Sequence, residues 1–325
     1  MCAKLSSLLN TPTEVEAKPF REPVFLLGLM RSGTTLLMNT LSEHPQLLKV
    51  GFELNKVWTE IGGAPCSVNC ELRTAGDLKQ EYANNMTAYF QSYIEDSKSF
   101  KRHLARWSAK RYYGSGGIFY DWEQVHPMNK SPHLSNKVSY VNAMFPKSKF
   151  VTLVRSLEGQ VASMKMHFMS YQKDGDWTFY LPKEQGSCWT NYQGEVPKEI
   201  PKDRLFPGNF ELLAEAWLRL NKLMLTQLQE VSKAQRLVLT YEQLVENQSD
   251  SLSRIFDFLE LDSKHQGKVQ QICQKKRKVQ NTTTSGNPLE KWKKYLTQEE
   301  QNILESFRER NKEQIAEIEQ LLAQL

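Results

Sequence analysis

Two glycines, Gly28 and Gly33, stand five positions apart in a short segment of small, hydroxyl and basic side chains. The hydroxyl and basic residues of this segment are Arg31, Ser32, Thr34 and Thr35. A nucleotide-binding P-loop reads G-x-x-x-x-G-K-[ST], so the glycine spacing agrees, but Thr34 stands where the P-loop has its lysine. A glycine turn of this kind points backbone N–H groups and the positive end of the next helix at an anion. We therefore predict a phosphate-binding turn in which Arg31 supplies the cation, for a nucleotide whose transferred group is not a γ-phosphate.

Such a turn needs a strand before it and a helix after it, and the sequence supplies both. Val24 to Gly28 is an apolar run without alternation, as expected of a strand buried on both faces of a parallel sheet, and residues 36–41 have helical spacing. Similar apolar runs predict strands at 47–50, 150–154 and 237–241. Helices are expected at 134–145, at about 210–228, and from a capping box at Thr297 and Glu300 towards Leu325. The alternation predicts an α/β fold with a doubly wound parallel sheet and a P-loop-like core.

Three stretches do not follow this alternation. Residues 1–20 are predicted to be a polar lead-in, and residues 21–325 a single domain. Within it, residues 52–127 are expected to form a helical insertion, and residues 169–208, rich in Pro, Gly and aromatic residues, a long loop. The loop has two interpretations: a satellite core, or a lid with aromatic and acidic side chains that contact a flat or cationic acceptor. Its aromatic residues include Trp177, Phe179, Tyr180, Trp189 and Tyr192.

Composition and charge exclude several classes of protein. The 325 residues are 40% hydrophobic and 24% charged, as in a globular chain with a sizeable core. The longest strongly apolar run, Val24 to Met30, is far shorter than the roughly 20 residues that cross a bilayer, so no membrane partner is expected. The net charge of +5 is too small to indicate nucleic-acid binding, but it suits a polyanionic small ligand.

The cysteines and the N-terminal residues indicate which cellular compartment to expect and whether a metal site is predicted. Five scattered cysteines favour a reducing compartment, and no signal peptide is visible before Phe20, so a cytoplasmic location is expected. Cys66 and Cys70 are separated by three residues, but no second pair accompanies them. No compact cluster of histidines, cysteines or carboxylates is visible either, so the sequence predicts no metal site.

The segment Arg31-Ser32-Gly33-Thr34-Thr35 after an apolar strand resembles the 5′-phosphosulfate loop of the sulfotransferase family. The donor of that family is 3′-phosphoadenosine 5′-phosphosulfate (PAPS), and its product is adenosine 3′,5′-bisphosphate. The resemblance implies a second site, with an arginine at the end of a later strand and a serine eight residues on, both binding the 3′-phosphate. Arg155 follows the strand expected at 150–154, and Ser163 stands eight residues later. A guanidinium and a hydroxyl suit a phosphate, because both donate hydrogen bonds to its oxygens.

Further segments extend the resemblance over about residues 22–310, to the branch that includes tyrosylprotein and bacterial small-molecule sulfotransferases. They are Asn129-Lys130-Ser131-Pro132, Tyr241 to Val245, and Lys291-Trp292. The resemblance implies that Tyr241 and Trp292 lie at the donor site. It also implies that Lys291 reaches the donor phosphates, with Thr283, Thr284 or Ser285 nearby. Lys130, together with Arg31, would stabilise the bridging oxygen of the donor.

The resemblance also suggests the general base. Glu53 follows the second strand, where the tyrosylprotein branch has its glutamate base. His126 and His133, which flank Lys130, are the alternatives, since histidine is the base in the cytosolic branch. In one departure, His167 stands where some members have an arginine four residues after the phosphate-binding serine. The basic run at 275–278 is a candidate to supply that missing cation.

These features lead to a prediction of function. Sulfuryl transfer is an in-line displacement that needs a base and cations, with no obvious demand for Mg²⁺. The chain is expected to transfer a sulfuryl group from PAPS to a hydroxyl or amine of a small-molecule acceptor, with no metal required. Two alternatives stay open: a P-loop nucleoside-triphosphate-dependent kinase, and a catalytically inactive nucleotide-binding module of the same fold. The acceptor and the oligomeric state stay open as well.

Overall fold

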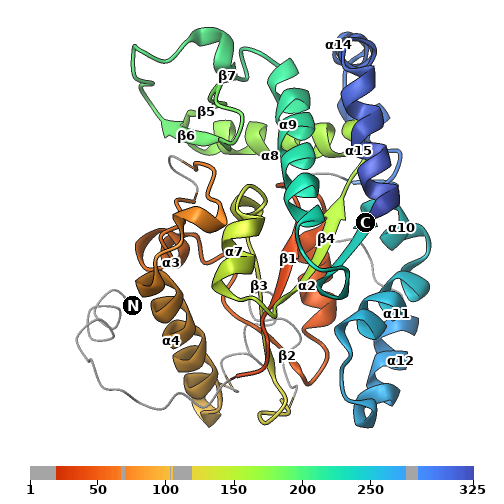
Figure 1. Cartoon of the computed structure of the whole chain (residues 1–325). Helices are drawn as coiled ribbons and strands as arrows, with labels where there is room; N and C mark the ends of the chain where they lie inside the picture. Colours follow the sequence, from red (N-terminus) through yellow and green to blue (C-terminus); the bar gives the residue numbers. More distant parts are fainter. Residues whose placement is uncertain (1–19, 67–69, 103, 105–118, 276–284) are drawn as a thin grey trace.

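The fold is described from a computed structural model of the chain. It describes residues 20–66, 70–102, 104, 119–275 and 285–325 (Figure 1). The lead-in expected at residues 1–20 therefore lies outside the described residues, apart from Phe20. No helix of the described ranges combines the length and the apolar character that a bilayer crossing requires.

A five-stranded parallel sheet forms the centre of the molecule, in the order β2-β3-β1-β4-β8. Its strands are β1 (Val24–Leu27), β2 (Leu47–Lys49), β3 (His126–Lys130), β4 (Lys149–Val154) and β8 (Arg236–Thr240). The register pairs Leu26 with Lys130 on one side and with Val151 on the other, so these strands end close to one edge. The four strands expected from apolar runs are confirmed.

The fifth strand, β3, is not predicted from the sequence, because its composition hides it. Residues up to about 127 were expected to belong to a helical insertion, yet His126 and Pro127 pair with β2. A proline seldom occurs in a strand with neighbours on both sides, since it cannot donate a hydrogen bond to the sheet. Asn129 and Lys130 are polar as well, so the segment lacks the apolar run by which its neighbours are recognised.

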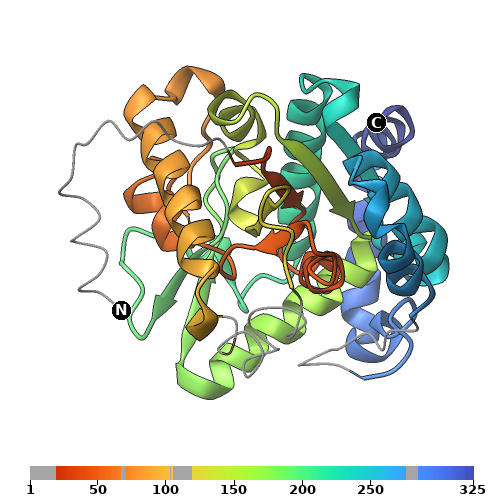
Figure 2. The same cartoon turned by 90° about the horizontal axis from the view of Figure 1, so that it is seen from below.

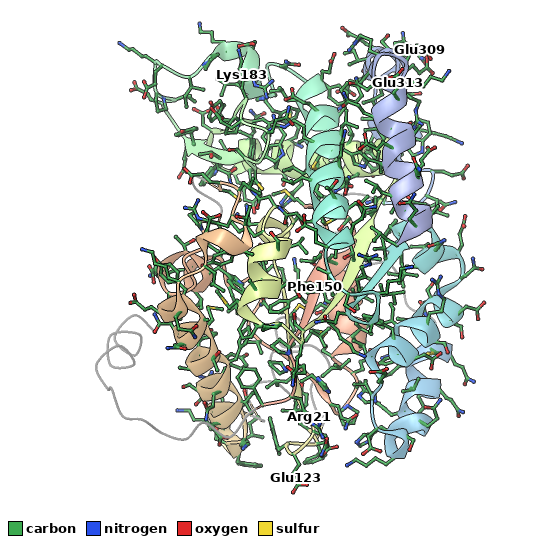
Figure 3. The ribbon with its side chains drawn as sticks, viewed as in Figure 1. Arg21, Glu123, Phe150, Lys183, Glu309 and Glu313 are labelled. Atoms are coloured by element: carbon green, nitrogen blue, oxygen red, sulfur yellow. The ribbon has the colours of Figure 1, made fainter. Side chains whose placement is uncertain are left out.

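Helices cover both faces of the sheet, as a doubly wound fold requires. Residues alternate along β1: Val24 and Leu26 pack on the face covered by α2 (Thr34–Leu41) and α11 (Gln248–Leu259). Phe25 and Leu27 pack on the other face with α3 (Asn55–Glu60), α4 (Gln80–Ser97), α7 (Val138–Met144) and α9 (Glu211–Gln229). In Figure 1, α3 and α4 lie to the left of the central strands and α11 and α12 (Gln266–Gln274) to the right, and Figure 2 shows the same separation from below. Phe150 of β4 lies in the middle of the ribbon, whereas Lys183, Glu309 and Glu313 lie at its periphery (Figure 3).

A second, smaller sheet replaces most of the loop expected at 169–208. Helix α8 (Leu157–Gly175) runs on into this stretch, and β5 (Trp177–Tyr180), β6 (Thr190–Gln193) and β7 (Leu205–Phe206) form an antiparallel sheet in the order β6-β5-β7. Phe179 stacks on Phe168 of α8 with ring centroids 3.8 Å apart, and Trp189 is buried beside them. Phe179 and Trp189 thus belong to the core. The small sheet lies beyond the carboxyl edge of the parallel sheet (Figure 1).

The remaining helices follow β8 and complete the described chain. They are α10 (Tyr241–Glu246), α13 (Trp292–Tyr295), α14 (Gln298–Arg310) and α15 (Lys312–Gln324). Short 3₁₀ turns occur earlier in the chain and include η1 (Ala75–Asp77), before α4, and η2 (Pro132–Leu134), after β3. The capping box is confirmed, because Glu300 N donates to Thr297 Oγ1 at 3.2 Å and Thr297 N to Glu300 Oε2 at 2.8 Å. The helix expected towards Leu325 is two helices, since the backbone at Asn311 leaves the helical conformation.

Candidate active site at the carboxyl edge of the parallel sheet

The turn between β1 and α2 has the backbone that only glycine accepts at two of its positions. Gly28 has φ +146° and Gly33 has φ +104°. A Cβ at Gly28 would lie 2.6 Å from the carbonyl oxygen of Leu153, and one at Gly33 would lie 2.6 Å from the ring of Tyr241. Gly33 is also the N-cap of α2 and has no side chain to accept from the first amides of the helix. An anion is the natural acceptor for those amides.

Arg155, directly after β4, joins this turn. Its Nη1 donates to the carbonyl oxygen of Arg31 at 3.1 Å, and its guanidinium lies 4.3 Å from the ring centre of Tyr241. Tyr241 thus contacts both Gly33 and Arg155. The indole of Trp217 donates to the carbonyl oxygen of Arg155 at 2.8 Å and holds the backbone there. The two phosphate sites expected from the sequence therefore lie side by side.

Two more residues expected at the donor site reach the same place. Arg31 Nε donates to Ser163 Oγ, on α8, at 3.2 Å. Burial, with the charges of Arg155 and Arg31 added to it, lowers the pKa of Lys291 to about 8. Burial also lowers the pKa values of both arginines, and for Arg31 the charge of Arg155 adds to the effect. Three cations converge here, and an anion of multiple charge would relieve their mutual repulsion.

The cluster at the glycine turn also contains buried hydrogen-bond donors that a phosphate could satisfy. Ser32 Oγ and Arg155 Nε are buried and accept or donate no hydrogen bond within the described ranges. Thr34 is buried and Thr35 exposed at the start of α2. Buried polar atoms without partners are rare in proteins, and a bound ligand can supply the missing partner. This set of donors fits an anionic ligand.

An ion pair between Glu53 and Lys130 lies at the ends of β2 and β3. Lys130 Nζ is 2.6 Å from Glu53 Oε1, and the Lys130 and Glu53 side chains are 4% and 26% exposed. The ring of Phe52 lies 4.6 Å from Lys130 Nζ. The carboxylate is thus the accessible member of the pair, while the ammonium is buried below it.

The residues around Lys130 hold it in place. Asn129 accepts from Trp58 Nε1 at 3.2 Å and donates to the carbonyl oxygen of Val50 at 3.0 Å. Ser131 Oγ donates to Asn55 Oδ1 at 2.7 Å. The Asn-Lys-Ser segment is thereby fastened to α3 and to the end of β2.

His167 lies within the electrostatic field of both the ion pair and the cluster at the glycine turn. Burial and then the charge of Arg31 lower its pKa to about 4; Glu53 raises this pKa and Lys130 lowers it further. Its imidazole is therefore neutral at physiological pH, and it senses the charges of both clusters. Glu53 also raises the pKa of Arg31, which places the carboxylate within the field of the glycine turn.

Lys49 is a member of this neighbourhood that the sequence analysis missed. Its Nζ donates to Asn39 Oδ1 at 2.9 Å, and burial together with Lys130 lowers its pKa to about 8. The signal was present, since Lys49 stands inside the apolar run at 47–50 that predicted a strand. A lysine in a buried strand needs a partner or a ligand.

Several expected site residues are not brought to this cluster. His126 lies at the amino end of β3, with Nδ1 2.8 Å from the carbonyl oxygen of Glu22. Lys130 stands four positions further along the strand, a distance of about 13 Å. The His133 ring lies among buried cysteine thiols.

Only some of the candidate site residues near the C-terminus lie within the described ranges. Ser285 N donates to the hydroxyl oxygen of Tyr295 at 2.8 Å, and the Trp292 ring packs against the core. Lys275 pairs with Glu43 at 3.0 Å. Thr283, Thr284 and residues 276–278 lie outside the described residues.

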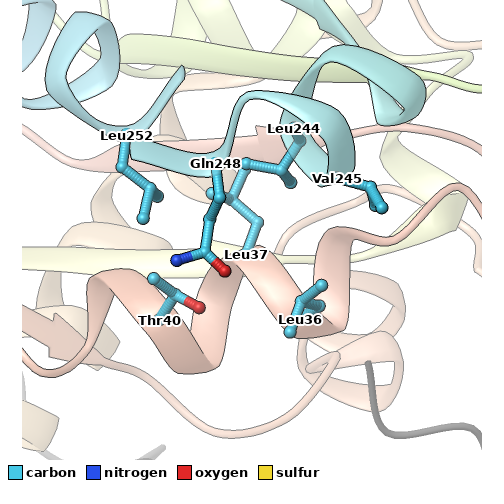
Figure 4. A pocket seen from close by; sticks show the side chains of 7 residues that line it. All are labelled: Leu36, Leu37, Thr40, Leu244, Val245, Gln248 and Leu252. Carbon is cyan, nitrogen blue, oxygen red and sulfur yellow. The ribbon is translucent and has the colours of Figure 1, made fainter. Parts of the chain in front are cut away.

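A pocket in the described part of the chain lies elsewhere, between α2 and the corner of α10 and α11 (Figure 4). It is lined by Leu36, Leu37, Thr40, Leu244, Val245, Gln248 and Leu252. None of the candidate site residues lines it, so it is separate from the site.

A parallel α/β sheet with a glycine turn and converging cations at its carboxyl edge defines a P-loop-like nucleotide-binding fold. Residues 23–265 match the model of the sulfotransferase family. This match covers most of the chain, and the chain therefore belongs to the sulfotransferase family, a family of transferases.

Individual relatives are distant. An uncharacterized protein of Aquifex aeolicus (strain VF5) is 23% identical over 323 residues, covering 92% of this chain and 35% of that protein. The chain thus spans about a third of the length of that curated relative. A sulfotransferase structure from Alicyclobacillus acidocaldarius has a TM-score of 0.48 and 12% identity, covering 94% of this chain and 97% of that one. A mouse sulfotransferase complexed with PAP has a TM-score of 0.37 and 13% identity, covering 91% and 82%.

Proposed function

We propose that the chain is a sulfotransferase that moves a sulfuryl group from PAPS to a hydroxyl or amine of a small-molecule acceptor. The observation that carries the proposal is the junction of the two phosphate sites: Tyr241 contacts both Gly33 and Arg155. A nucleotide with phosphates on both its 5′ and 3′ positions matches two adjacent anion sites. The family to which the chain belongs supports the same donor.

The two sites are proposed to bind different phosphate groups of the donor. The amides of the glycine turn, with Ser32, Thr34 and Thr35, are proposed to hold the 5′-phosphosulfate. Arg155 and Ser163 are proposed to hold the 3′-phosphate. Lys291 lies within the field of both arginines and adds charge between the sites. The unpartnered Ser32 Oγ and Arg155 Nε are the donors that such a ligand would satisfy.

Glu53 is the proposed general base. Its carboxylate is the exposed member of the pair with Lys130, so an acceptor can reach it from solvent. The ammonium beside it holds the carboxylate at the ends of β2 and β3, at an Nζ–Oε1 distance of 2.6 Å. Lys130 and Arg31 are then placed to neutralise charge that develops on the donor oxygens during an in-line displacement. His126 is the weaker alternative, because it lies at the other end of β3.

A nucleoside-triphosphate-dependent kinase fits these residues less well. Thr34 stands where such a kinase has the lysine that reaches the β- and γ-phosphates. The cations that are present converge instead on the end of β4, where an adenosine 3′-phosphate is expected.

Calorimetry with adenosine 3′,5′-bisphosphate and with ATP–Mg²⁺ tests the donor. We expect binding of the bisphosphate without Mg²⁺, and much weaker binding of ATP. Transfer of labelled sulfate from PAPS to a panel of phenols, alcohols and amines then tests the activity. Tight, Mg²⁺-dependent ATP binding without bisphosphate binding would reverse the assignment, and bisphosphate binding with no transfer to any acceptor would favour the inactive module.

A further inference from the structure

Three buried side chains with ligand atoms for a metal meet at the turn that follows β3. They are Cys70, before η1, His133, in η2, and Cys188, between β5 and β6. Their sulfur and imidazole nitrogen atoms all lie within 4.8 Å of one another, and the residues are 2%, 8% and 5% exposed. Segments far apart in the sequence thus bring two thiols and an imidazole to one point.

The backbone around the cluster holds these segments together. Cys188 N donates to the carbonyl oxygen of Cys70 at 2.9 Å. The side-chain amide of Asn136 donates to the carbonyl oxygens of Gly186 at 2.5 Å and of Cys70 at 3.4 Å. The backbone therefore brings the two cysteines together. Their closeness does not result from side-chain rotation alone.

A fully buried lysine faces the cluster. Lys137 Nζ donates to Asn136 Oδ1 at 2.7 Å, to the carbonyl oxygen of His133 at 3.1 Å and to Cys70 Sγ at 3.3 Å. Two of these acceptors are neutral oxygens, so the sulfur is the acceptor that can carry a compensating negative charge. A buried ammonium requires such compensation. The environment of Lys137 therefore favours an anionic, thiolate-rich site.

We propose that Cys70, His133 and Cys188 bind a structural zinc ion, with Cys66 as the fourth ligand. Thiolates and imidazole are the donors that zinc prefers, and the cluster contains no carboxylate of the kind that calcium or magnesium needs. Ligand atoms of a tetrahedral zinc site stand about 3.5–3.8 Å apart, given Zn–S of about 2.3 Å and Zn–N of about 2.0 Å. Movements of about an ångström or less bring the three atoms to that spacing.

Charge balance supports Cys66 as the fourth ligand. Three thiolates and a neutral imidazole on Zn²⁺ carry a net charge of −1, which the ammonium of Lys137 balances. Cys66 is 3% exposed and stands four positions before Cys70, although its Sγ lies outside the group of three ligand atoms that are within 4.8 Å of one another. That thiol now lies 3.2 Å from the carbonyl oxygen of Ala64 and would turn from it to the metal.

Such a zinc ion would fasten the loop before η1 and the small antiparallel sheet to the turn after β3. That turn directly follows Lys130, so the ion would stabilise the position of the Glu53–Lys130 pair without touching reactants. The sequence predicted no metal because Cys66 and Cys70 have no second pair nearby. The fold supplies the other two ligands from distant positions.

Metal analysis of the full-length protein, produced with zinc and freed of loosely bound metal by gel filtration, tests the proposal. We expect zinc in a one-to-one ratio with the chain, and most of it lost in Cys70→Ser and Cys188→Ser. Cys273→Ser is the matched control, since Cys273 is a buried cysteine of α12 that lies outside the cluster, and it should retain the zinc. Replacement by Co²⁺ should give the visible absorption of a tetrahedral thiolate site, weakened in Cys66→Ser.

If the serine variants fail to fold, the unmodified protein still decides the question. A mercurial reagent that blocks thiols should release zinc in equal amount to the chain, as a zinc-sensitive dye reports. Protein that holds no zinc, or zinc that stays bound when the thiols are blocked, overturns the proposal. A disulfide between Cys70 and Cys188, found by peptide mass after digestion without reductant, also overturns it and identifies a dithiol pair instead.

Discussion

Glu53 and Lys130 form an ion pair in which the ammonium is buried and the carboxylate is partly exposed. The carboxylate compensates the charge of the ammonium, which would be costly to bury alone. Neither residue is near the other in sequence, and each was proposed separately from its motif. Their contact joins two separately predicted residues in one arrangement of a carboxylate beside a cation.

Replacing Glu53 by glutamine should reduce turnover by roughly 10²–10⁴-fold, the usual contribution of a general base. Binding of adenosine 3′,5′-bisphosphate should change little, because Glu53 is proposed to contact the acceptor. Steady-state transfer assays and calorimetry measure the two quantities. Glu60→Gln, which alters an exposed pair with Lys56 on the neighbouring helix α3, is the matched control. Equal losses of binding and turnover in Glu53→Gln would assign the residue to the donor site instead.

Lys291 makes donor binding depend on pH. Its pKa of about 8 in the free protein means that the ammonium is partly deprotonated near that pH. A bound polyanion favours the charged form and raises this pKa, so binding should take up protons around pH 8, and affinity should fall as the pH rises above it. Calorimetry in buffers of different ionisation enthalpy measures the uptake.

Lys291→Arg is the control for this pH dependence, because it keeps the charge and does not titrate in the range. Lys49 has a pKa of about 8 as well, but it lies beside Lys130 and away from Arg155. Proton uptake that persists unchanged in Lys291→Arg would therefore move the effect from Lys291 to another group such as Lys49.

At the scale of elements, the turn between β1 and α2 requires glycine, because a side chain at Gly33 would collide with its surroundings. Gly33→Ala would place a Cβ 2.6 Å from the Tyr241 ring, at a φ of +104° that costs about 1–3 kcal/mol for other residues. We expect bisphosphate affinity to fall more than about tenfold, by the same energy scale, and the midpoint of thermal unfolding to fall as well. Gly267→Ala in α12 is the control, since a Cβ there meets nothing within 4 Å. A Gly33→Ala protein with unchanged affinity would show that the turn does not contact the donor.

Whether an element could be predicted depended on how clearly the pattern of its own residues indicates a strand or a helix. The strands around Phe25, Phe150 and Leu239 are mostly apolar, because helices cover both of their faces, and the sequence predicts them. Strand β3 was missed because Pro127, Asn129 and Lys130 interrupt the apolar pattern by which the other strands are recognised. The small sheet was missed because its strands are short and half-exposed, so no alternation stands out.

At the scale of the whole molecule, the site is assembled from the ends of strands and from a distant C-terminal segment. Arg155 Nη2 donates to the carbonyl oxygen of Pro288 at 3.1 Å, and Lys165 of α8 pairs with Glu300 at 2.6 Å. These contacts hold the segment that carries Lys291 against the end of β4. Sequence motifs could identify the single members of the donor site, but only the fold shows which of the histidines, lysines and cysteines join them. His126, His133 and Lys49 illustrate this limit.

A ligand that joins these parts must stabilise the whole molecule when it binds. At a bisphosphate concentration of 100 times its Kd, the free energy of unfolding rises by about 2.7 kcal/mol, which corresponds to roughly 4 °C in the melting temperature of a chain of this size.

Arg155→Ala removes hydrogen bonds to a charged group worth about 1.5–3 kcal/mol, so affinity should fall roughly 10- to 150-fold. At the same ligand concentration, between about half of the shift and nearly all of it should then disappear, each variant being compared with its own ligand-free melting temperature. Arg310→Ala on α14, which breaks an exposed pair with Glu211 of α9, should keep the full shift. Equal shifts in both variants would mean that the bisphosphate binds without the guanidinium at the end of β4, and the two-site assignment of the donor would have to be abandoned.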